Sequence, residues 1–554
     1  MNAASNIPLA MPESGIAQGS YFVIFGSGLG PSNIAVAPSL NFTTTLAGTS
    51  VTVKPATGAA VQCYLYYAAN QQVAGILPST TPTGTATVTV TYNGATSEPA
   101  EITVVRSNFG IFTRNGQGSG PASISNFGAS NAGLNGLSNA AANNQVLVLY
   151  GTGLGPINGA DNIPPGASSP SDITVRVLVG DQSVAAQYAG RAPEFPGLDQ
   201  INFQLPPNIP DGCFVPIAVQ VNGVFSNYAT FAKTATGGAC SADLPATALQ
   251  RLDAGGTITV GQLSLARTAL SATILGFNLN VKTDLAGGVF GAIDRSGLYN
   301  LSLTPGALPP LTPNGTCFVQ TFFSIDPPTS TVPSLPSPLD AGPLTLTGPS
   351  NKTQSLAFTA GTGYLRGLAQ AGLPPIPGLT FPGVLTVPAG SPETYIEAGG
   401  WTVKGSGGAG VGPFTASIAV PPPFTCATCD KFSTIDRSKP LKIDWTGGGG
   451  DQDYVQVVGT STTPLLADPS RNVAVVFSCS AKASDGTLTV PPAILGQLPT
   501  STDNLLSTNV GAIVVINGQG LAHGGFTAPL TAGGNLDLGY FGAPTVVLRV
   551  VGYN

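Results

Sequence analysis

Short apolar runs that end in glycine-rich turns recur along the chain. One run covers residues 22–25 and stops at a Gly-x-Gly-Leu-Gly-Pro turn at 26–31, and the pattern returns 125 residues later at 147–150 and 151–156. An apolar run bounded in this way is typical of a buried β-strand, and glycine tolerates backbone angles that other residues resist. The repeat predicts two related β-domains in the first half of the chain.

The details within the two copies agree with this prediction. Residues 86–92 alternate between apolar and polar side chains, which places the apolar ones on one face of a strand. Asn93-Gly94 follows directly, and this dipeptide is a strong signal for a two-residue hairpin turn. The second copy repeats the signal at Asn222-Gly223, and residues 200–206 align with residues 72–78. Each copy has the size of an immunoglobulin-like β-sandwich of about 100 residues.

The predicted fold is all-β, with tandem immunoglobulin-like β-sandwiches and long Gly/Pro-rich loops. Sandwich 1 is expected at residues 1–112 and sandwich 2 at 146–240, separated by a semi-ordered Gly/Asn/Ser-rich connector at 113–145. Within the connector, residues 121–127 have a composition that suits an added strand.

The second half of the chain is predicted to hold two further β-domains. A larger β-sandwich is expected at 241–420, with Pro-rich loops at 304–313, 327–338 and 374–388 and a short helix at 363–370. An immunoglobulin-like domain is expected at 421–554, in which Trp445 packs near a cysteine strand. Residues 491–498 are expected to form one or two helical turns.

Charge is scarce along the whole chain. Only 8% of the 554 residues are charged, against about 25% in an ordinary soluble domain. The 20 Lys and Arg form no basic run, which excludes an electrostatic footprint for nucleic acid. No apolar stretch approaches the roughly 18 residues of a membrane-spanning helix.

Because charged residues are scarce, the outer strand faces must be covered by Ser, Thr, Asn, Gln and Gly. This surface suits packing against copies of the chain, glycan or cell wall; a compositional bias of the source organism or heavy glycosylation would also produce it.

Seven cysteines favour disulfides and an oxidising compartment. Cys213 and Cys240 lie near the ends of the last strands of sandwich 2, a spacing that suits a disulfide. Cys426 and Cys429 either pair with each other, or one of them pairs with Cys479; a zinc site would need two more ligands. The pairing of Cys63, Cys317, Cys426, Cys429 and Cys479 stays open, as does glycosylation of the four Asn-x-Ser/Thr sites.

No catalytic, cofactor-binding or metal-binding residues are predicted. The single histidine, His523, lies in a glycine-rich stretch and is expected to be a solvated loop residue. Residues 405–410 match Gly-x-Gly-x-x-Gly, but a strand pattern follows them where a dinucleotide site needs a helix. Asp451 and Asp453 are expected in a turn, since they lack the pattern of a calcium loop. The chain is therefore predicted not to be an enzyme and to need no cofactor.

Residues 2–240 resemble a family of secreted acidobacterial proteins that share an uncharacterised Solibacter-type C-terminal domain. The resemblance rests on residues 2–5, 25–30, 110–113, 118–120, 150–155 and 199–206. The sequence departs from the family at residues 72–74, where Gln-Val-Ala replaces Gln-Ile-Asn, and in the position of the domain at the start of the chain. The resemblance implies an immunoglobulin/TIG-like fold and export, and it assigns no catalytic residue.

Together these patterns predict a secreted or cell-surface structural protein that self-assembles into an extracellular layer or fibre. We expect it to be exported by a signal peptide that is absent from this chain, because residues 1–5 lack a charged and an apolar segment; a cytoplasmic protein is the alternative. A second hypothesis is an adhesin that binds cell-surface glycan or polysaccharide through aromatic residues in the 304–390 loops, namely Phe322, Phe323, Tyr364 and Phe381. A third is a glycoside hydrolase with a carboxylate pair in the 241–420 domain.

Overall fold

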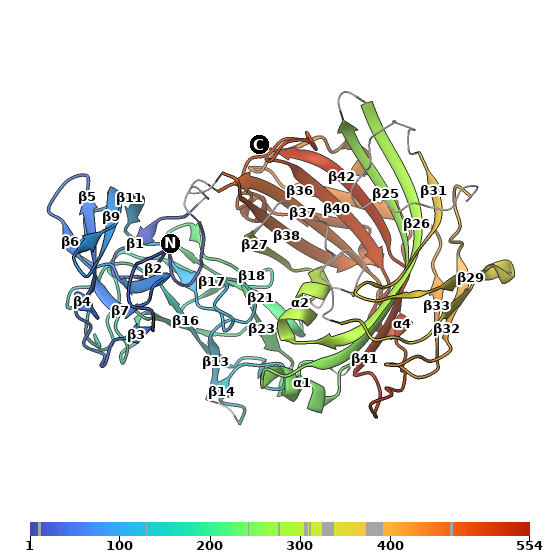
Figure 1. Cartoon of the computed structure of the whole chain (residues 1–554), viewed down its shortest axis with the longest axis horizontal. Helices are drawn as coiled ribbons and strands as arrows, with labels where there is room; N and C mark the ends of the chain where they lie inside the picture. Colours follow the sequence, from blue (N-terminus) through green and yellow to red (C-terminus); the bar gives the residue numbers. More distant parts are fainter. Residues whose placement is uncertain are drawn as a thin grey trace. The chain divides into compact units, whose positions relative to one another are not determined.

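The protein folds into two compact units in a computed structural model (Figure 1). The first comprises mainly Met1–Asp211 and Val215–Gly238, and the second mainly Ala239–Pro464 and Ser470–Asn554. The structure describes the chain except residues 9, 10, 12, 129, 242, 275, 276, 304–307, 310, 311, 324–336, 373–391 and 466–468. The predicted loop at 374–388 and most of the loops at 304–313 and 327–338 lie outside the described residues.

The first sandwich packs a four-stranded sheet against a seven-stranded one. The four-stranded sheet has the order β2 (Tyr21–Phe25), β8 (Gln72–Ile76), β7 (Tyr64–Ala68) and β3 (Ala35–Val36). The seven-stranded sheet has the order β1 (Ile16–Ala17), β11 (Ala100–Val105), β9 (Gly84–Tyr92), β5 (Thr49–Pro55) and β4 (Thr45–Leu46), with β10 (Ala95–Thr96) and β6 (Val61–Gln62) at its sides. Phe22, Leu65 and Val90 are buried between the two sheets. The predicted hairpin joins β9 to β10, and Asn93 and Gly94 both have positive φ.

The second sandwich repeats the two-layer plan. One sheet has the order β14 (Gly133–Leu134), β13 (Ile124–Phe127), β16 (Val146–Thr152), β20 (Asp199–Gln204) and β19 (Tyr188–Arg191), with β12 (Gly110–Ile111) beside β16. The other has the order β18 (Gln182–Ala185), β17 (Val175–Val179), β21 (Gly212–Val221), β23 (Ala229–Lys233), β15 (Ala140–Ala142) and β24 (Thr236–Gly238), with β22 (Val224–Phe225) beside β21. The tandem β-sandwich prediction is confirmed in this unit.

The region predicted as a connector is part of the second sandwich. As expected for residues 121–127, β13 pairs with β16. In addition, β12 pairs with β16, β15 pairs with β23, and Ile111 and Ile124 are buried in the core of the second sandwich. The structure thus places the change from the first to the second sandwich before residue 110. Gly- and Asn-rich composition suggested a linker, but the buried isoleucines bring this segment into the fold.

The second unit is built on an eleven-stranded sheet. Its order is β27 (Cys317–Phe323), β38 (Asn472–Lys482), β37 (Tyr454–Pro464), β40 (Gly511–Gly518), β42 (Thr545–Tyr553), β25 (Ile258–Ile274), β26 (Phe277–Ile293), β31 (Gly363–Ala371) and β30 (Phe358–Thr359), with β41 (Leu538–Gly542) beside β25 and β35 (Thr434–Ile435) beside β42. Figure 1 shows β25 and β26 as long, curved strands, and each has 17 residues.

Two smaller sheets and four short helices complete the second unit. One sheet has the order β29 (Thr353–Leu356), β28 (Leu344–Thr347), β32 (Gly399–Gly405) and β33 (Phe414–Val420). The other has the order β34 (Thr425–Cys426), β36 (Leu441–Thr446) and β39 (Thr487–Val490). Leu265, Phe290 and Trp401 join β25, β26 and β32 in one apolar core. The helices are α1 (Ala246–Asp253), α2 (Arg295–Leu303), α3 (Pro492–Leu495) and α4 (Leu521–Gly524), and α3 confirms the helical turn predicted at 491–498. Within the described residues, none of the helices has the length and apolarity to cross a membrane.

Two predictions for this half of the chain are wrong. The boundary at residue 420 runs through the eleven-stranded sheet, because β25 pairs with β41 and β42 and β27 pairs with β38. Residues 363–370 are not helical but belong to β31, which completes the hydrogen bonding of β26. Trp445 is buried on β36, where it is paired with Cys426 of β34. Its indole nitrogen donates to the carbonyl of Ala483, directly after the strand that holds Cys479; the predicted tryptophan near a cysteine strand is therefore present.

Candidate functional site

The second Gly-x-Gly-Leu-Gly turn surrounds a buried ion pair. The amides of Gly153 and Leu154 each donate to Asp199 Oδ2 at 2.7 Å, and Arg191 Nη1 donates to Asp199 Oδ1. Arg191 Nη2 donates to the carbonyls of Gly19 and Gly155, both at 2.9 Å. Burial raises the pKa of Asp199, whereas Arg191 and the two amides act in the opposite direction. Both charges are thus compensated by fixed partners, as a structural ion pair requires.

The first copy of the turn uses a neutral acceptor in place of the carboxylate. Gly28 donates to Asn70 Oδ1 at 3.1 Å, and Leu29 donates to the Asn70 carbonyl at 2.9 Å. The turn motif therefore presents two amides to an acceptor in both copies. Only the second copy adds an arginine that reaches Gly19 in the first sandwich.

A second polar contact also joins the two sandwiches. Asp161 accepts hydrogen bonds from the Ser79 amide and hydroxyl, both at 2.7 Å, and the Ser79 hydroxyl accepts one from the Ile157 amide at 3.1 Å. These buried groups satisfy one another and leave no group oriented toward a substrate. The junction is an architectural feature, and sequence analysis did not identify Arg191 or Asp161 in it.

An aromatic cluster lies on the outer side of the four-stranded sheet. Its members are Tyr21, Phe42, Tyr66, Tyr67 and Phe112, with ring centroids of successive neighbours 5.5–6.5 Å apart. The β7–β8 register shifts between Leu65 and Tyr67, which is a β-bulge that places both Tyr66 and Tyr67 on the side away from the core. The alternation rule alone would have placed Tyr66 and Tyr67 on opposite faces.

His523 contacts a carboxylate from a distant turn. Its Nδ1 lies 2.8 Å from Asp453 Oδ1, and the side chains are 48% and 8% exposed, respectively. Asp453 also accepts a hydrogen bond from the Gly450 amide at 3.0 Å. The predicted turn at Asp453 is present, but His523 is anchored and not simply solvated. This contact was missed because 70 residues separate the partners.

The His523–Asp453 pair resembles the base and orienting acid of a hydrolase, but other parts of such a site are needed for catalysis. In the described part of the chain, no hydrogen bond joins His523 to a serine, threonine or cysteine. Asp451 instead contacts Ser484, and no group of three metal-ligating side chains is found among the described residues. The pair connects the turn to α4, and within the described ranges no nucleophile is bonded to it.

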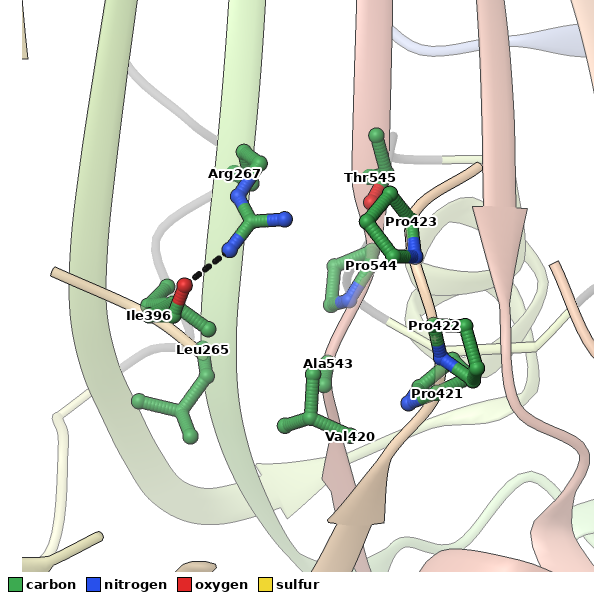
Figure 2. A pocket seen from close by; sticks show the side chains of 10 residues that line it. All are labelled: Leu265, Arg267, Ile396, Val420, Pro421, Pro422, Pro423, Ala543, Pro544 and Thr545. Atoms are coloured by element: carbon green, nitrogen blue, oxygen red, sulfur yellow. Dashed lines mark hydrogen bonds between the residues drawn. The ribbon is translucent and has the colours of Figure 1, made fainter. Parts of the chain in front are cut away.

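A small hollow in the second unit is shown in Figure 2. Its lining residues are Leu265, Arg267, Ile396, Val420, Pro421, Pro422, Pro423, Ala543, Pro544 and Thr545. The Arg267 guanidinium donates to the Ile396 carbonyl, and Arg267 Nε lies 3.5 Å from Asp284 Oδ1. The hollow has a volume of about 10 Å³, which is room for about one water molecule. It is too small for a substrate.

The aromatic residues expected to bind glycan do not form one group. Tyr364 is buried, and its hydroxyl accepts from the Ala341 amide and donates to the Gly342 carbonyl, each at 2.8 Å. The prediction of an exposed ring at Tyr364 is therefore wrong. Phe322 is exposed on β27, whereas Phe381 and the side chain of Phe323 lie outside what the structure describes.

The structure answers the open question of cysteine pairing. Cys213–Cys240 is bonded as predicted, and Cys426–Cys429 is the first of the two alternatives for that pair. Cys317–Cys479 joins β27 to β38 across 162 residues, a separation that gave no local signal. Cys63 is a free thiol in the core of the first sandwich, where burial raises its pKa.

Comparison with known proteins adds only faint similarities. No family model matches the chain, and no curated protein matches it. Among solved structures, a tetra-tandem repeat from the extending region of a large adhesion protein has 12% identity and a TM-score of 0.14, covering 98% of this chain and 97% of that one. Immunoglobulin domains 1–4 of Sidekick-1 have 8% identity and a TM-score of 0.11, with both chains covered fully. Domains 4–9 of the surface layer protein SbsC have 11% identity and a TM-score of 0.12, covering 91% of this chain and 58% of that one. At these TM-scores the similarities carry no argument about function.

Proposed function

We propose that this chain is a non-enzymatic secreted or cell-surface structural protein that self-associates into an extracellular layer or fibre. The observation that carries the proposal is the near absence of charge on its outer sheet faces. On β9, Thr85, Thr87, Thr89 and Thr91 alternate with core residues. Natural proteins usually place charges on strands to prevent association between sheets. A protein that omits them is suited to contact its own copies.

The same surface chemistry recurs in the second unit. In the sheet formed by β28, β32 and β33, Thr347 faces Thr402, and Thr402 lies 3.1 Å from the Ser417 hydroxyl. Lys404 is the charged residue of the adjacent row. Hydroxyl-lined faces keep a sheet hydrated without the mutual repulsion that charge would add.

Three disulfides support an extracellular location within the proposal, since such bonds persist in oxidising compartments. Export by a signal peptide and membership of residues 2–240 in the Solibacter-type family are parts of the same proposal. Among the described residues no serine, threonine or cysteine is hydrogen-bonded to His523, which fits a non-enzymatic role.

A second candidate is an adhesin that binds neutral glycan. Exposed aromatic rings favour it, since such rings stack against apolar faces of ligands; Phe127 and Phe195 are the examples in the second sandwich. Retention of the protein on an insoluble neutral polysaccharide, lost when both rings are replaced by alanine, would support this candidate.

The test of the main proposal is light scattering of the native, non-reduced chain over a wide concentration range, with electron microscopy of the same samples. We expect the mass to rise with concentration and regular oligomers or filaments to form. A strict monomer at every concentration would contradict self-association.

A further inference from the structure

The four-stranded sheet of the first sandwich is apolar on both faces. Phe22, Leu65 and Val73 point into the core. Phe25, Ile34, Val36, Tyr66 and Tyr67 lie on the other side, and we call this set the apolar face. Since side chains alternate along a strand, the solvent side of an antiparallel sheet is normally polar. An apolar solvent side therefore needs a further explanation.

The placement of these side chains follows from strand register. Val36 on β3 is paired with Tyr67 on β7, and Ile34 lies two residues before Val36 along the same extended segment. Phe25 is paired with Gln72, and Tyr67 with Ala74, so β8 separates Phe25 from the β7 tyrosines. The five side chains thus share one side of one sheet.

Part of this side is already a contact surface within the first unit. A Cβ added at Gly197 of the second sandwich would lie 2.7 Å from Ile76 Cδ1 and 3.1 Å from Tyr21 Cε2. The second sandwich therefore closely approaches the Tyr21 end of the sheet. Outside this contact, Phe25 is 57%, Ile34 62% and Val36 51% exposed, and Tyr66 is 40% exposed although its ring also packs against Tyr21. The apolar face continues an existing interface beyond the point where the chain itself covers it.

The charge distribution restricts which kind of partner can cover the exposed part of the apolar face. Between residues 14 and 97, Lys54 is the single charged side chain, and it lies on β5 in the opposite sheet. The face therefore has no group to recognise a charged polymer or peptide. Ile34 and Val36 are highly exposed and offer a sugar no side-chain hydrogen bond, and the Gln72 side chain on this face is already bonded to Tyr67. A neutral apolar protein surface is the complementary partner, and another copy of this face is one.

We propose that two copies of this chain pair through the apolar face in an isologous contact centred on Val36 and Tyr66. This inference rests on the proposed function and names one contact surface for it; an isologous contact closes a pair of copies, so a layer or fibre would need a second contact elsewhere on the chain. In an isologous contact the same patch is used twice, so a mainly apolar face is complementary to itself; Gln72, which lies on it between Phe25 and Tyr67, is hydrogen-bonded to Tyr67. The edge strand β3 has only two residues, so side-chain packing, and not strand addition, holds the pair together.

The test compares variants of the full, non-reduced chain by sedimentation and light scattering. Val36→Lys is expected to weaken association at least about tenfold, because it places an unpaired ammonium group in an apolar contact. Leu134→Lys is the matched control, since Leu134 is also 51% exposed on a short strand, in the second sandwich. It is expected to associate like the unchanged chain. Far-UV circular dichroism checks that both variants fold, and Ile34→Lys provides an independent substitution on the same face.

A mixing experiment tests the isologous geometry. Val36→Lys and Val36→Glu are each expected to associate weakly, and an equimolar mixture is expected to recover most of the association, because each contact then joins opposite charges. No recovery in the mixture would overturn the isologous contact.

The outcomes separate this inference from the proposed function. If the unchanged chain associates and Val36→Lys associates equally well, the apolar face is not the interface, although self-association stands. If the unchanged chain is monomeric throughout, both proposals fail. If that monomer binds a neutral polysaccharide such as cellulose and Val36→Lys does not, the face binds glycan, which also overturns the pairing of copies.

Discussion

At the residue scale, some of the few charged side chains are buried, where they have a large effect on stability. Arg191 and Asp199 are 1% and 0% exposed, and the arginine also donates to backbone carbonyls of both sandwiches. Removing one member of such a pair leaves the charge of the other buried without a partner. The resulting loss of folding free energy is larger than the net stabilisation that the intact pair provides. The stability of the tandem sandwiches is therefore sensitive to single charged residues despite the low total charge.

Replacing Arg191 by methionine is expected to lower the free energy of unfolding of the first unit by about 3–5 kcal/mol near neutral pH. Burial already raises the pKa of Asp199, and loss of the arginine raises it further. A carboxyl group whose pKa is higher in the folded than in the unfolded protein stabilises the fold at pH values below its unfolded pKa. This stabilisation is lost as the pH rises through the folded pKa. Urea unfolding should therefore show a smaller deficit at about pH 4.5 than at about pH 7.5. Arg114→Met, at an exposed position, is the control and should leave the free energy of unfolding unchanged at both pH values. An equal loss of unfolding free energy for Arg191→Met at both pH values would contradict the mechanism.

At the element scale, the repeated turn shows how one motif is used in two environments. Gly28 and Gly153 occupy equivalent positions with φ of 70° and 109°. A Cβ at Gly28 would meet nothing within 4 Å, whereas a Cβ at Gly153 would lie 2.2 Å from the Asn108 carbonyl oxygen. The first turn therefore needs glycine for its backbone angles, and the second needs it for close packing as well.

Alanine substitution is expected to separate these two requirements. Gly28→Ala should destabilise the protein by about 1–2 kcal/mol, the cost of a left-handed backbone conformation with a Cβ. Gly153→Ala should cost at least about twice as much, since the backbone around Asn108 must also shift. Thermal unfolding of the two variants is a direct comparison. Equal losses would show that the contact with Asn108 is easily relieved.

The disulfides offer a second comparison between elements. Cys317–Cys479 closes a separation of 162 residues between β27 and β38, and Cys426–Cys429 closes one of three. Because loop-closure entropy grows with loop length, double alanine variants are expected to lose about 5 and about 2 kcal/mol, respectively. Urea unfolding under non-reducing conditions measures both. A larger loss for the short loop would indicate that native-state packing around Cys429, and not chain entropy, dominates.

At the scale of the whole molecule, the second unit is held together by strands that are far apart in sequence. β42 lies between β40 and β25, and β38 lies between β37 and β27. The last 134 residues alone would expose both of these inner strands as edges. Unpaired strands of this length lose their ladder hydrogen bonds and tend to aggregate.

A fragment of residues 421–554 is therefore expected not to fold by itself. A fragment of residues 241–554 keeps β25 and β27 and should retain the large sheet. Far-UV circular dichroism with thermal unfolding should show a cooperative transition for the longer fragment and none for the shorter one. A cooperative transition in the fragment of residues 421–554 would contradict this expectation and would show that a domain boundary at residue 420 is correct.

Much of the fold was predictable because the signals that define strands are local. Alternation over 86–92 and Asn93-Gly94 located β9 and its hairpin, and the repeated turn located β2 and β16. The Cys213–Cys240 pair was also accessible, since only 27 residues separate its members, which lie near the ends of the last strands of the second sandwich. The negative expectations for catalytic, metal and cofactor sites remain predictions.

The remaining features arise from contacts between distant segments. The sequence by itself determined the β-class, the internal duplication and the charge-poor surface, because composition and side-chain periodicity are properties of each segment alone. Only the tertiary structure decided that β25 pairs with β42, that His523 meets Asp453, and that the β7 bulge directs two tyrosines to the apolar face. Strand partners are selected by long-range packing and hydrogen bonding, and short-range sequence patterns carry no information about these contacts. Alternation shows that a strand has two faces, but the covering of each face depends on the complete fold.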